Sequence, residues 1–312
     1  MEPYALFLND AGRLRSGWRL GIFVLVLVAL AFSLGKLVQV AYAIALLVNP
    51  GATMRAYVGD LVFRILLLVS AVLAGWICNH WLEGLPWRAL GLSFHANWFR
   101  DLCIGSLIGI GSLAFATVIA VAAGGLRFTV SGKEMYLSIL RTLISTALLF
   151  IVAALAEESL FRGYPLQTLI RAGLVWLALL LTSVPFGIVH LRNPSATVFS
   201  TINTALAGVW FGIAYLKTRS LWLPLGVHWA WNWTQGSIFG LKVSGLTLSN
   251  HPVLQALDKG PAWLTGGSYG IEGGLACTMA LLVSTLFIWR TGLVSATPEM
   301  KKLTSEENPV RR

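Results

Sequence analysis

Two adjacent carboxylates stand near the end of a long apolar segment, where charge is costly. Glu157 and Glu158 are followed by Arg162 in the stretch AEESLFRGY. On a helix Glu158 and Arg162 share a face, whereas Glu157 points about 100° away. We therefore expect Glu158 and Arg162 to form an ion pair. Glu157 would then be an unpaired carboxylate suited to general-base catalysis.

Two further polar pairs follow in later apolar segments. Phe186 precedes His190 by one helical turn, and His228 precedes Asn232 at the same spacing. A lone His in an apolar helix is usually a core residue. Two His and an Asn on separate segments, in a chain with 5 His, indicate one convergent polar site that includes Glu157. Such a site offers a base to activate water and donors to hold an oxyanion, as peptide hydrolysis requires.

Zinc is a second chemistry open to the same residues. His190 and His228, with Glu157, could complete a three-ligand Zn²⁺ site with an open position for water. The sequence has no His-Glu-x-x-His helix, and the same side chains can work as a metal-free Glu/His site. Both interpretations stay open at this point.

Membrane helices must carry these residues. The chain has 312 residues, of which 56% are hydrophobic and 12% charged, whereas soluble domains carry about 25% charged residues. Its mean hydropathy is +0.74. The apolar residues form long unbroken runs, which argues against the short alternating segments of a β-barrel. We predict an all-α, polytopic integral membrane protein of about eight transmembrane helices. The predicted spans lie near 20–48, 56–79, 102–123, 143–163, 173–191, 196–216, 221–241 and 270–289.

Charge sets the expected orientation. The segments on the side of both termini hold thirteen Lys and Arg residues against six on the other side, so both termini are predicted to be cytoplasmic, in a cell membrane. The net charge of +10 is spread between apolar runs and forms no aromatic-rich patch, which argues for membrane lipids and against nucleic acid as partners. Cys78, Cys103 and Cys277 are predicted to be free packing residues.

The chain divides into three expected parts. Residues 1–130 would form N-terminal transmembrane helices, and residues 131–245 a catalytic core. Residues 246–312 would hold an external loop, the last transmembrane helix and a cytoplasmic tail. The tail, which begins at Thr297, is rich in charge and is predicted to be disordered.

Other polar or small residues within the spans have structural explanations. Asp60 and Arg64 are one helical turn apart and are predicted to neutralise each other. Gly105 and Gly109 form a pair of small residues that predicts close packing of two helices.

The three motifs, in this order and on successive spans, resemble a known family. Glu-Glu-x-x-x-Arg, Phe-x-x-x-His and His-x-x-x-Asn are similar to the motifs of the CAAX-protease and bacteriocin-processing family of intramembrane endopeptidases, also called the Abi family. The resemblance covers roughly residues 140–240. It implies an eight-helix membrane core with a cavity that opens towards the cytoplasmic side. The implied roles are water activation for Glu157 and His190, oxyanion stabilisation for His228 and Asn232, and completion of the first motif for Glu158 and Arg162.

The leading hypothesis is therefore an intramembrane endopeptidase that acts near the cytoplasmic face on a membrane-associated protein or peptide, lipidated or not. Its alternatives are a non-catalytic immunity or scaffold protein and a proton-coupled transporter with Glu157 as relay. The absence of an internal repeat weakens the transporter. The sequence does not choose among prenylated CAAX proteins, bacteriocin precursors and unrelated membrane peptides. Trp229, Trp231 and Trp233 fit interfacial anchors better than cavity lining.

One difficulty concerns depth in the membrane. The span near 173–191 places His190 at the opposite end of the membrane from Glu157. A shared site would require residues 164–175 to lie along the interface, or the hairpin at 190–196 to sit within the protein.

Overall fold

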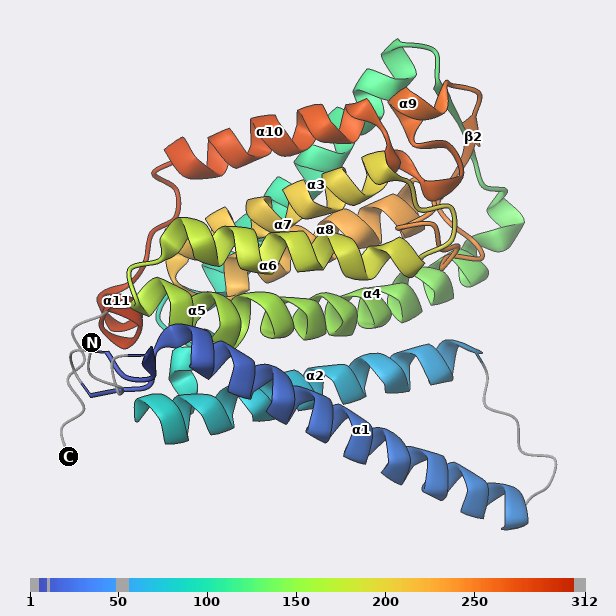
Figure 1. Cartoon of the computed structure of the whole chain (residues 1–312). Coiled ribbons are helices and arrows are strands. Elements are labelled where there is room, and N and C mark those ends of the chain that lie inside the picture. Colours follow the sequence, from blue (N-terminus) through green and yellow to red (C-terminus); the bar gives the residue numbers. More distant parts are fainter. Residues whose placement is uncertain (1–5, 10–11, 49–55, 306–312) are drawn as a thin grey trace.

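The protein is a bundle of helices in the computed structural model, which describes residues 6–9, 12–48 and 56–305 (Figure 1). Arg55, Arg311 and Arg312, which enter the charge count above, lie outside the described residues. The long helices and the helices joined to them are α1 (Ser16–Val48), α2 (Ala56–Glu83), α3 (Trp98–Ala122), α4 (Tyr136–Glu158), α5 (Tyr164–Arg171), α6 (Val175–Val189), α7 (Val198–Thr218), α8 (Trp222–Trp233) and α10 (Leu275–Arg290).

Shorter elements join or cap these helices. Two π-helical segments each directly extend a helix: Ser159–Gly163 follows α4 and Thr234–Ile238 follows α8. The remaining elements are the strands β1 (Leu126–Val130) and β2 (Leu254–Asp258), the helices α9 (Ala262–Thr265) and α11 (Pro298–Thr304), and 3₁₀ turns at Trp87–Leu90, Lys133–Met135, His190–Arg192, Gly267–Tyr269 and Ile271–Gly273.

The helices have the length and composition of membrane spans. In the described part of the chain, 6 helices are long and apolar enough to cross a membrane, and α10 is a shorter apolar helix. The predicted segment at 221–241 corresponds to α8 and the π-helical segment that extends it. The prediction of a polytopic helical membrane protein is therefore confirmed.

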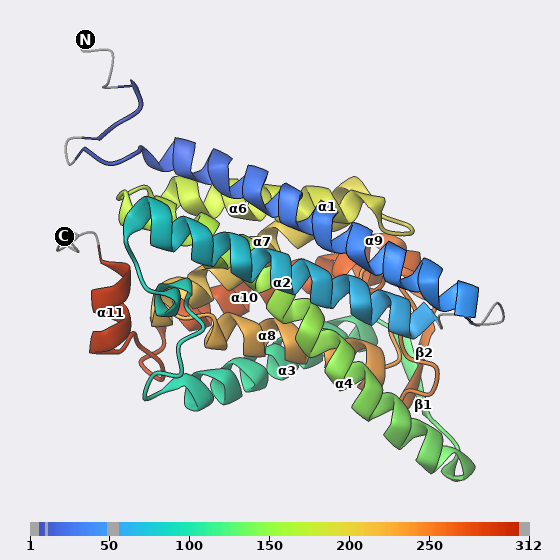
Figure 2. The ribbon, with the colours of Figure 1, turned by 90° about the horizontal axis from the view of Figure 1, so that it is seen from below.

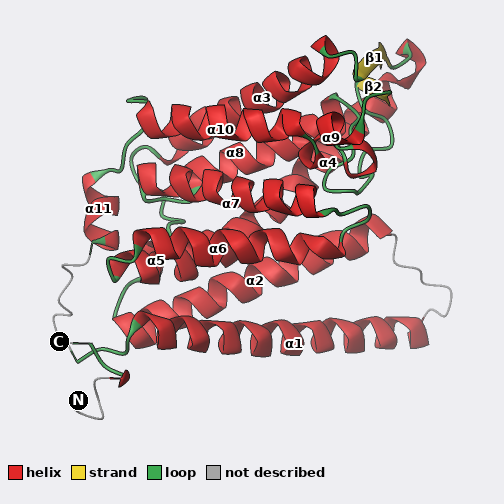
Figure 3. Cartoon of the chain, turned by 45° about the horizontal axis from the view of Figure 1, so that its top comes forward, coloured by secondary structure: helices red, strands yellow, loops and turns green. Residues whose placement is uncertain are grey.

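The bundle is layered. In Figure 1, α1 and α2 lie along one side, α4 and α5 come next, and α6, α7, α8, α3 and α10 complete the bundle. Figure 2 shows α1 and α2 from below, covering the α6–α8 part of the bundle. In Figure 3, α11 and the start of α1 lie at one end of the bundle, whereas the strands and α9 lie at the other. The largest core cluster is formed by α3, α7, α8, α10 and the elements that pack on them.

The fourth span is longer than predicted, and this difference resolves the depth of His190. The prediction ended the span at residue 163, but the helical path continues through the π-helical segment to Arg171. A π-helix at this position is consistent with Pro165, which lacks an N–H and would clash with the carbonyl of residue 161 in a regular helix.

The chain then reverses within three residues. Gly173, at φ +76°, ends α5: its N–H bonds to Ile170 O, and the N–H of Leu174 bonds to Leu169 O. This is the αL ending that glycine favours. Because α6 starts at Val175 and runs back, the 14 steps from Glu157 to Arg171 and the 15 steps from Val175 to His190 both span about 20 Å at 1.5 Å per step. Neither an interfacial segment at 164–175 nor a submerged hairpin is needed.

Helices α3 and α8 touch through glycine. A Cβ atom on Gly105 would lie 2.3 Å from Leu223 O, and one on Gly109 would lie 2.4 Å from Val227 O. From the facing helix, a Cβ on Gly226 would lie 2.3 Å from Leu102 O. The predicted small-residue contact is confirmed, and it sets the position of the helix that carries His228 and Asn232.

The strands and the tail depart from the prediction. β1 and β2 pair antiparallel, from Leu126 opposite Asp258 to Val130 opposite Leu254, so the loop after residue 246 contains a strand that the sequence pattern did not indicate. The predicted disorder of the tail is wrong up to residue 305, because α11 buries Met300 against the bundle.

The three cysteines are free, as predicted.

We predict that Gly109→Ala lowers the stability of the protein, because its methyl group meets a backbone carbonyl. A loss of about 1–3 kcal/mol is typical of such overpacking. Gly111→Ala is the matched control, since a Cβ there meets nothing within 4 Å. Thermal unfolding of both variants in detergent measures the difference, and equal midpoints would show that α3 and α8 are not in close contact.

Candidate active site

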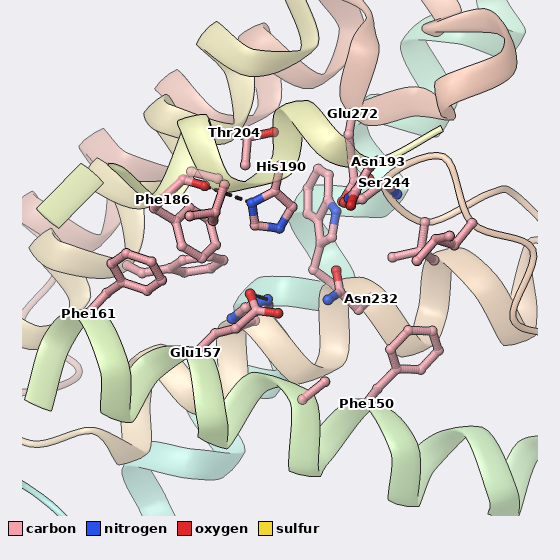
Figure 4. A pocket seen from close by; sticks show the side chains of 18 of the residues that line it. Phe150, Glu157, Phe161, Phe186, His190, Asn193, Thr204, Asn232, Ser244 and Glu272 are labelled. Atoms are coloured by element: carbon pink, nitrogen blue, oxygen red, sulfur yellow. Dashed lines mark hydrogen bonds and ion pairs between the residues drawn. The ribbon is translucent and has the colours of Figure 1, made fainter. Parts of the chain in front are cut away.

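A cavity of about 490 Å³ lies between α2, α4, α6, α7 and α8 and is also lined by the loops before α10 and by α10 itself. The site residues predicted from the sequence converge on it. In Figure 4, Glu157 stands on one wall, His190 faces it from the opposite wall, and Asn232 lies beside both. His228 also lines the cavity. These four side chains come from two helices, α4 and α8, and a 3₁₀ turn, and their convergence agrees with the prediction of one polar site.

Glu158 and Arg162 are buried behind this cavity. Both side chains are 0% exposed, and Arg162 Nη1 lies 3.2 Å from Glu158 Oε1. Arg162 also donates through Nη2 to Gly208 O at 3.0 Å, and its guanidinium lies 4.5 Å from the centre of the Phe186 ring. The predicted ion pair is confirmed. Its partners on three helices fix the end of α4 against α6 and α7.

The same carboxylate orients His228. Its Nδ1 lies 2.8 Å from Glu158 Oε1, and its ring stacks on Phe211 with the ring centres 4.5 Å apart. A carboxylate only accepts hydrogen bonds. Nδ1 therefore carries a proton, and Nε2 is directed to the cavity, where it lies 3.7 Å from Glu157 Oε2.

His190 is held by the end of its own helix. The last turn of α6 tightens, so that the His190 N–H bonds to Gly187 O and Ile188 O. This leaves Phe186 O to the side chain, and His190 Nδ1 lies 2.7 Å from it (Figure 4). Because a carbonyl only accepts, Nδ1 is the donor and the neutral ring presents the lone pair of Nε2. The Phe-x-x-x-His spacing thus sets the tautomer of the His.

Glu157 differs from its prediction. Its side chain is 21% exposed and lies in the cavity, but it is not unpaired. Arg64 Nη1 lies 3.9 Å from Glu157 Oε1, in addition to the contact with His228. Arg64 is bonded to Asp60 at 2.8 Å, as predicted, yet this pair does not use the whole guanidinium. The sequence pattern could not reveal the contact because Arg64 and Glu157 belong to helices far apart in the chain.

Asn232 and Trp231 follow His228 on α8. Asn232 lines the cavity, and among the described residues no hydrogen bond engages its amide, which points into the space beside Glu157 (Figure 4). Trp231 is buried and also lines the cavity. Trp229 and Trp233 donate instead to the carbonyls of Ala147 and Leu143 on α4. The expectation of interfacial anchors is therefore wrong for Trp231. The sequence could not show this, because the face of α8 that meets the cavity depends on how the helix packs in the bundle.

A second carboxylate of the cavity was not found by sequence reasoning. Glu272 lies in the 3₁₀ turn before α10 and accepts from the backbone N–H of Ser244 at 2.5 Å and from its hydroxyl at 3.0 Å. Burial raises the pKa of Glu272 above its ordinary value, despite these hydrogen bonds. Asn203 of α7 holds the turn by donating to Glu272 O at 2.8 Å. No spacing signal marks a carboxylate in such a loop.

The arrangement of the His, Cys, Asp and Glu side chains decides whether the site could hold a metal ion. Among residues 6–9, 12–48 and 56–305, no group of three His, Cys, Asp or Glu side chains comes together in a way that could hold an ion. The hydrogen bonds of His228 Nδ1 to Glu158 and of His190 Nδ1 to Phe186 O leave the Nε2 atom of each ring free, as in a metal-binding His. The two rings and Glu157 are nevertheless not gathered into a three-ligand group as placed.

Comparison with known proteins identifies the class. Residues 138–234 match the model of a family described as type II CAAX prenyl endopeptidase Rce1-like. These residues include all of the motif positions, so the chain carries a domain of the Rce1-like CAAX prenyl endopeptidase (CPBP/Abi) family, and the resemblance is confirmed. A domain of this family implies a membrane endopeptidase. Comparisons with curated proteins and with solved structures gave no significant match.

We predict that Glu158→Gln destabilises the protein strongly, because it leaves the Arg162 guanidinium buried without a counter-charge. Breaking such a pair costs roughly 3–5 kcal/mol. Arg88→Gln is the control, because it breaks a pair with Glu299 in which the Arg88 side chain is 49% exposed; exposed pairs contribute about 0–1 kcal/mol. Unfolding of both variants in detergent gives the comparison. Equal losses would argue against the buried pair as an anchor.

Proposed function

We propose that the protein is an intramembrane endopeptidase that hydrolyses a peptide bond within its helical bundle, with Glu157 and His190 activating a water molecule. The observation that carries this proposal is the convergence of Glu157, His190, His228 and Asn232 on one cavity among apolar helices. Two of these side chains offer proton acceptors and two offer donors. Addition of water to an amide carbonyl requires both: an acceptor takes a proton from the water, and donors stabilise the negative charge on the carbonyl oxygen.

Water activation follows from the free acceptors. Glu157 Oε2 and His190 Nε2 both face the cavity, and the neutral His190 ring has only Nε2 left to accept. A water between them donates one hydrogen to each. Glu157 takes the proton as the water oxygen attacks the carbonyl carbon, and later returns it to the amine as the C–N bond breaks. Protons and electrons balance without a covalent intermediate.

Oxyanion stabilisation falls to α8. Asn232 can donate from Nδ2 without losing a protein partner among the described residues. His228 donates from Nε2 when its ring carries both protons, and the carboxylates at its two nitrogens supply the counter-charge for that form. Because Glu158 and Phe211 fix this ring, the donor is in place before the oxyanion forms, which is the condition for effective electrostatic catalysis.

A zinc-dependent version is the alternative within the same class. Its ligands would be His190, His228 and Glu157, and the ion would supply a Lewis acid and an activated water. The side chains would have to rearrange first, because the described residues hold no ready group of three ligands. We therefore derive the mechanism from the side chains alone.

The substrate class follows from the family and the cavity wall. Apart from Arg64 and Glu157, the cavity-lining residues of α2, of α4 and of the π-helical segment after α4 are apolar, with Phe63, Leu67, Phe150 and Leu160 among them, which suits a membrane-associated or lipidated chain. We propose prenylated CAAX proteins as the first substrates to test, ahead of bacteriocin precursors and other membrane peptides. With both termini cytoplasmic, as the charge bias indicates, α11 and the start of α1 mark the cytoplasmic end of the bundle. The helical path from Glu157 to Arg171 covers about 20 Å towards that end, so the proposed cleavage site lies deeper in the membrane than the sequence predicted.

We predict that Glu157→Gln abolishes turnover while the protein remains folded, because an amide replaces the base without changing its shape. Comparing the peptides of membranes that contain the wild type or the variant, by mass spectrometry, tests the activity and identifies the substrate. Glu134→Gln makes the same change outside the cavity and should behave as wild type. Unaltered peptides and retained biological function with Glu157→Gln would favour a non-catalytic immunity or scaffold role.

We predict that prolonged chelation leaves cleavage of a prenylated CAAX reporter peptide unchanged, because the mechanism uses side chains alone. The purified protein is assayed before and after chelation, and its zinc content is measured. Loss of activity that returns with one equivalent of zinc would support the metal-dependent version and contradict the side-chain mechanism.

A further inference from the structure

Ionisable side chains, alternately acidic and basic, form a chain through the site. It runs from Asp60 to Arg64, Glu157, His228, Glu158 and Arg162, with successive atom pairs at 2.8, 3.9, 3.7, 2.8 and 3.2 Å. The last four members belong to the motifs already described. The first two come from α2, outside the matched residues 138–234.

The contact with Asp60 leaves part of Arg64 free. Asp60 engages only Nε of Arg64, at 2.8 Å, so the Nη atoms remain for another partner. Arg64 lines the cavity, its side chain is 17% exposed, and Nη1 is the atom that faces Glu157. An ion pair whose only role was to neutralise an intramembrane charge would not need this second contact.

The position of Arg64 selects between the two oxygens of Glu157. Arg64 lies on the side of Oε1, whereas His228 lies on the side of Oε2. Two partners on opposite oxygens hold the carboxylate plane in one orientation. The planar guanidinium, itself anchored by Asp60, suits this task better than a flexible ammonium group.

We propose that Arg64 is a positioning residue of the hydrolytic site: anchored by Asp60, it orients Glu157 so that Oε2 meets the attacking water. This inference rests on the proposed function. Arg64 touches neither the water nor the peptide and acts through Glu157. Its expected signature is a loss in the chemical step with little change in substrate binding.

The test uses the full-length protein with Arg64→Gln, Arg64→Lys and Asp60→Asn, and with Arg88→Gln as the control for loss of an ion pair outside the cavity. Cleavage of a prenylated CAAX reporter peptide gives kcat and KM. We expect Arg64→Gln to lower kcat about tenfold to a hundredfold, as misplacement of a reacting group does, with KM changed less than about twofold. Asp60→Asn should give a smaller loss, and Arg64→Lys should recover part of kcat.

A second measurement does not depend on turnover. Thermal midpoints are measured for wild type, Arg64→Gln, Glu157→Gln and the double variant. Because residues in contact couple, the two single shifts should not add up to the shift of the double variant. Additive shifts would overturn the contact and with it the proposal.

The outcomes separate this proposal from the proposed function. Coupled midpoints with a selective loss of kcat in Arg64→Gln support the positioning role. Coupled midpoints with unchanged kcat, or a loss equal to that in Arg88→Gln, overturn it while the proposed function stands. Absence of any cleavage that depends on Glu157 overturns the proposed function itself, and the inference falls with it.

Discussion

A charge within a membrane domain must have a partner, and the Glu158–Arg162 pair is the point from which the other contacts of the site are built. Both side chains are fully buried, where an unpaired ion would cost several kcal/mol. Both residues also form hydrogen bonds outside the pair. Arg162 donates to the backbone carbonyl of Gly208 on α7, and Glu158 accepts from His228 on α8. One ion pair thus connects three helices, and the orientation of His228 is a consequence of that connection.

The surrounding helices supply the precision that a charge pair alone cannot give. α8 can approach α3 closely because glycine lines their contact, as at Gly109 and Gly226. The reversal at Gly173 returns α6 beside the helix of Glu157, and the tightened end of α6 frees the Phe186 carbonyl for His190. Backbone features therefore place three of the polar side chains, and hydrogen bonds to the backbone or to a carboxylate orient the rings of His190 and His228.

Sequence reasoning predicted those parts of the molecule that local spacing controls. The apolar segments, the pair four residues apart at Glu158 and Arg162, and the small-residue contact of α3 all depend on neighbours along one helix. Contacts between helices escaped it, notably Arg64 with Glu157. The continuation of a helix past residue 163 was also missed, because a π-helical segment has no hydropathy signal. The carboxylate of Glu272 was missed because a turn has no periodicity that would mark it.

The proposed mechanism requires that the cavity hold a scissile carbonyl within reach of the acceptors Glu157 and His190 and of the donors His228 and Asn232. An experimental structure of the Glu157→Gln variant with a bound prenylated CAAX peptide tests it most directly. The account predicts that the carbonyl oxygen of the scissile bond lies within hydrogen-bond distance of His228 Nε2 and Asn232 Nδ2, with His190 on the opposite side of the peptide. A peptide bound outside the cavity, or a carbonyl directed away from α8, would contradict it.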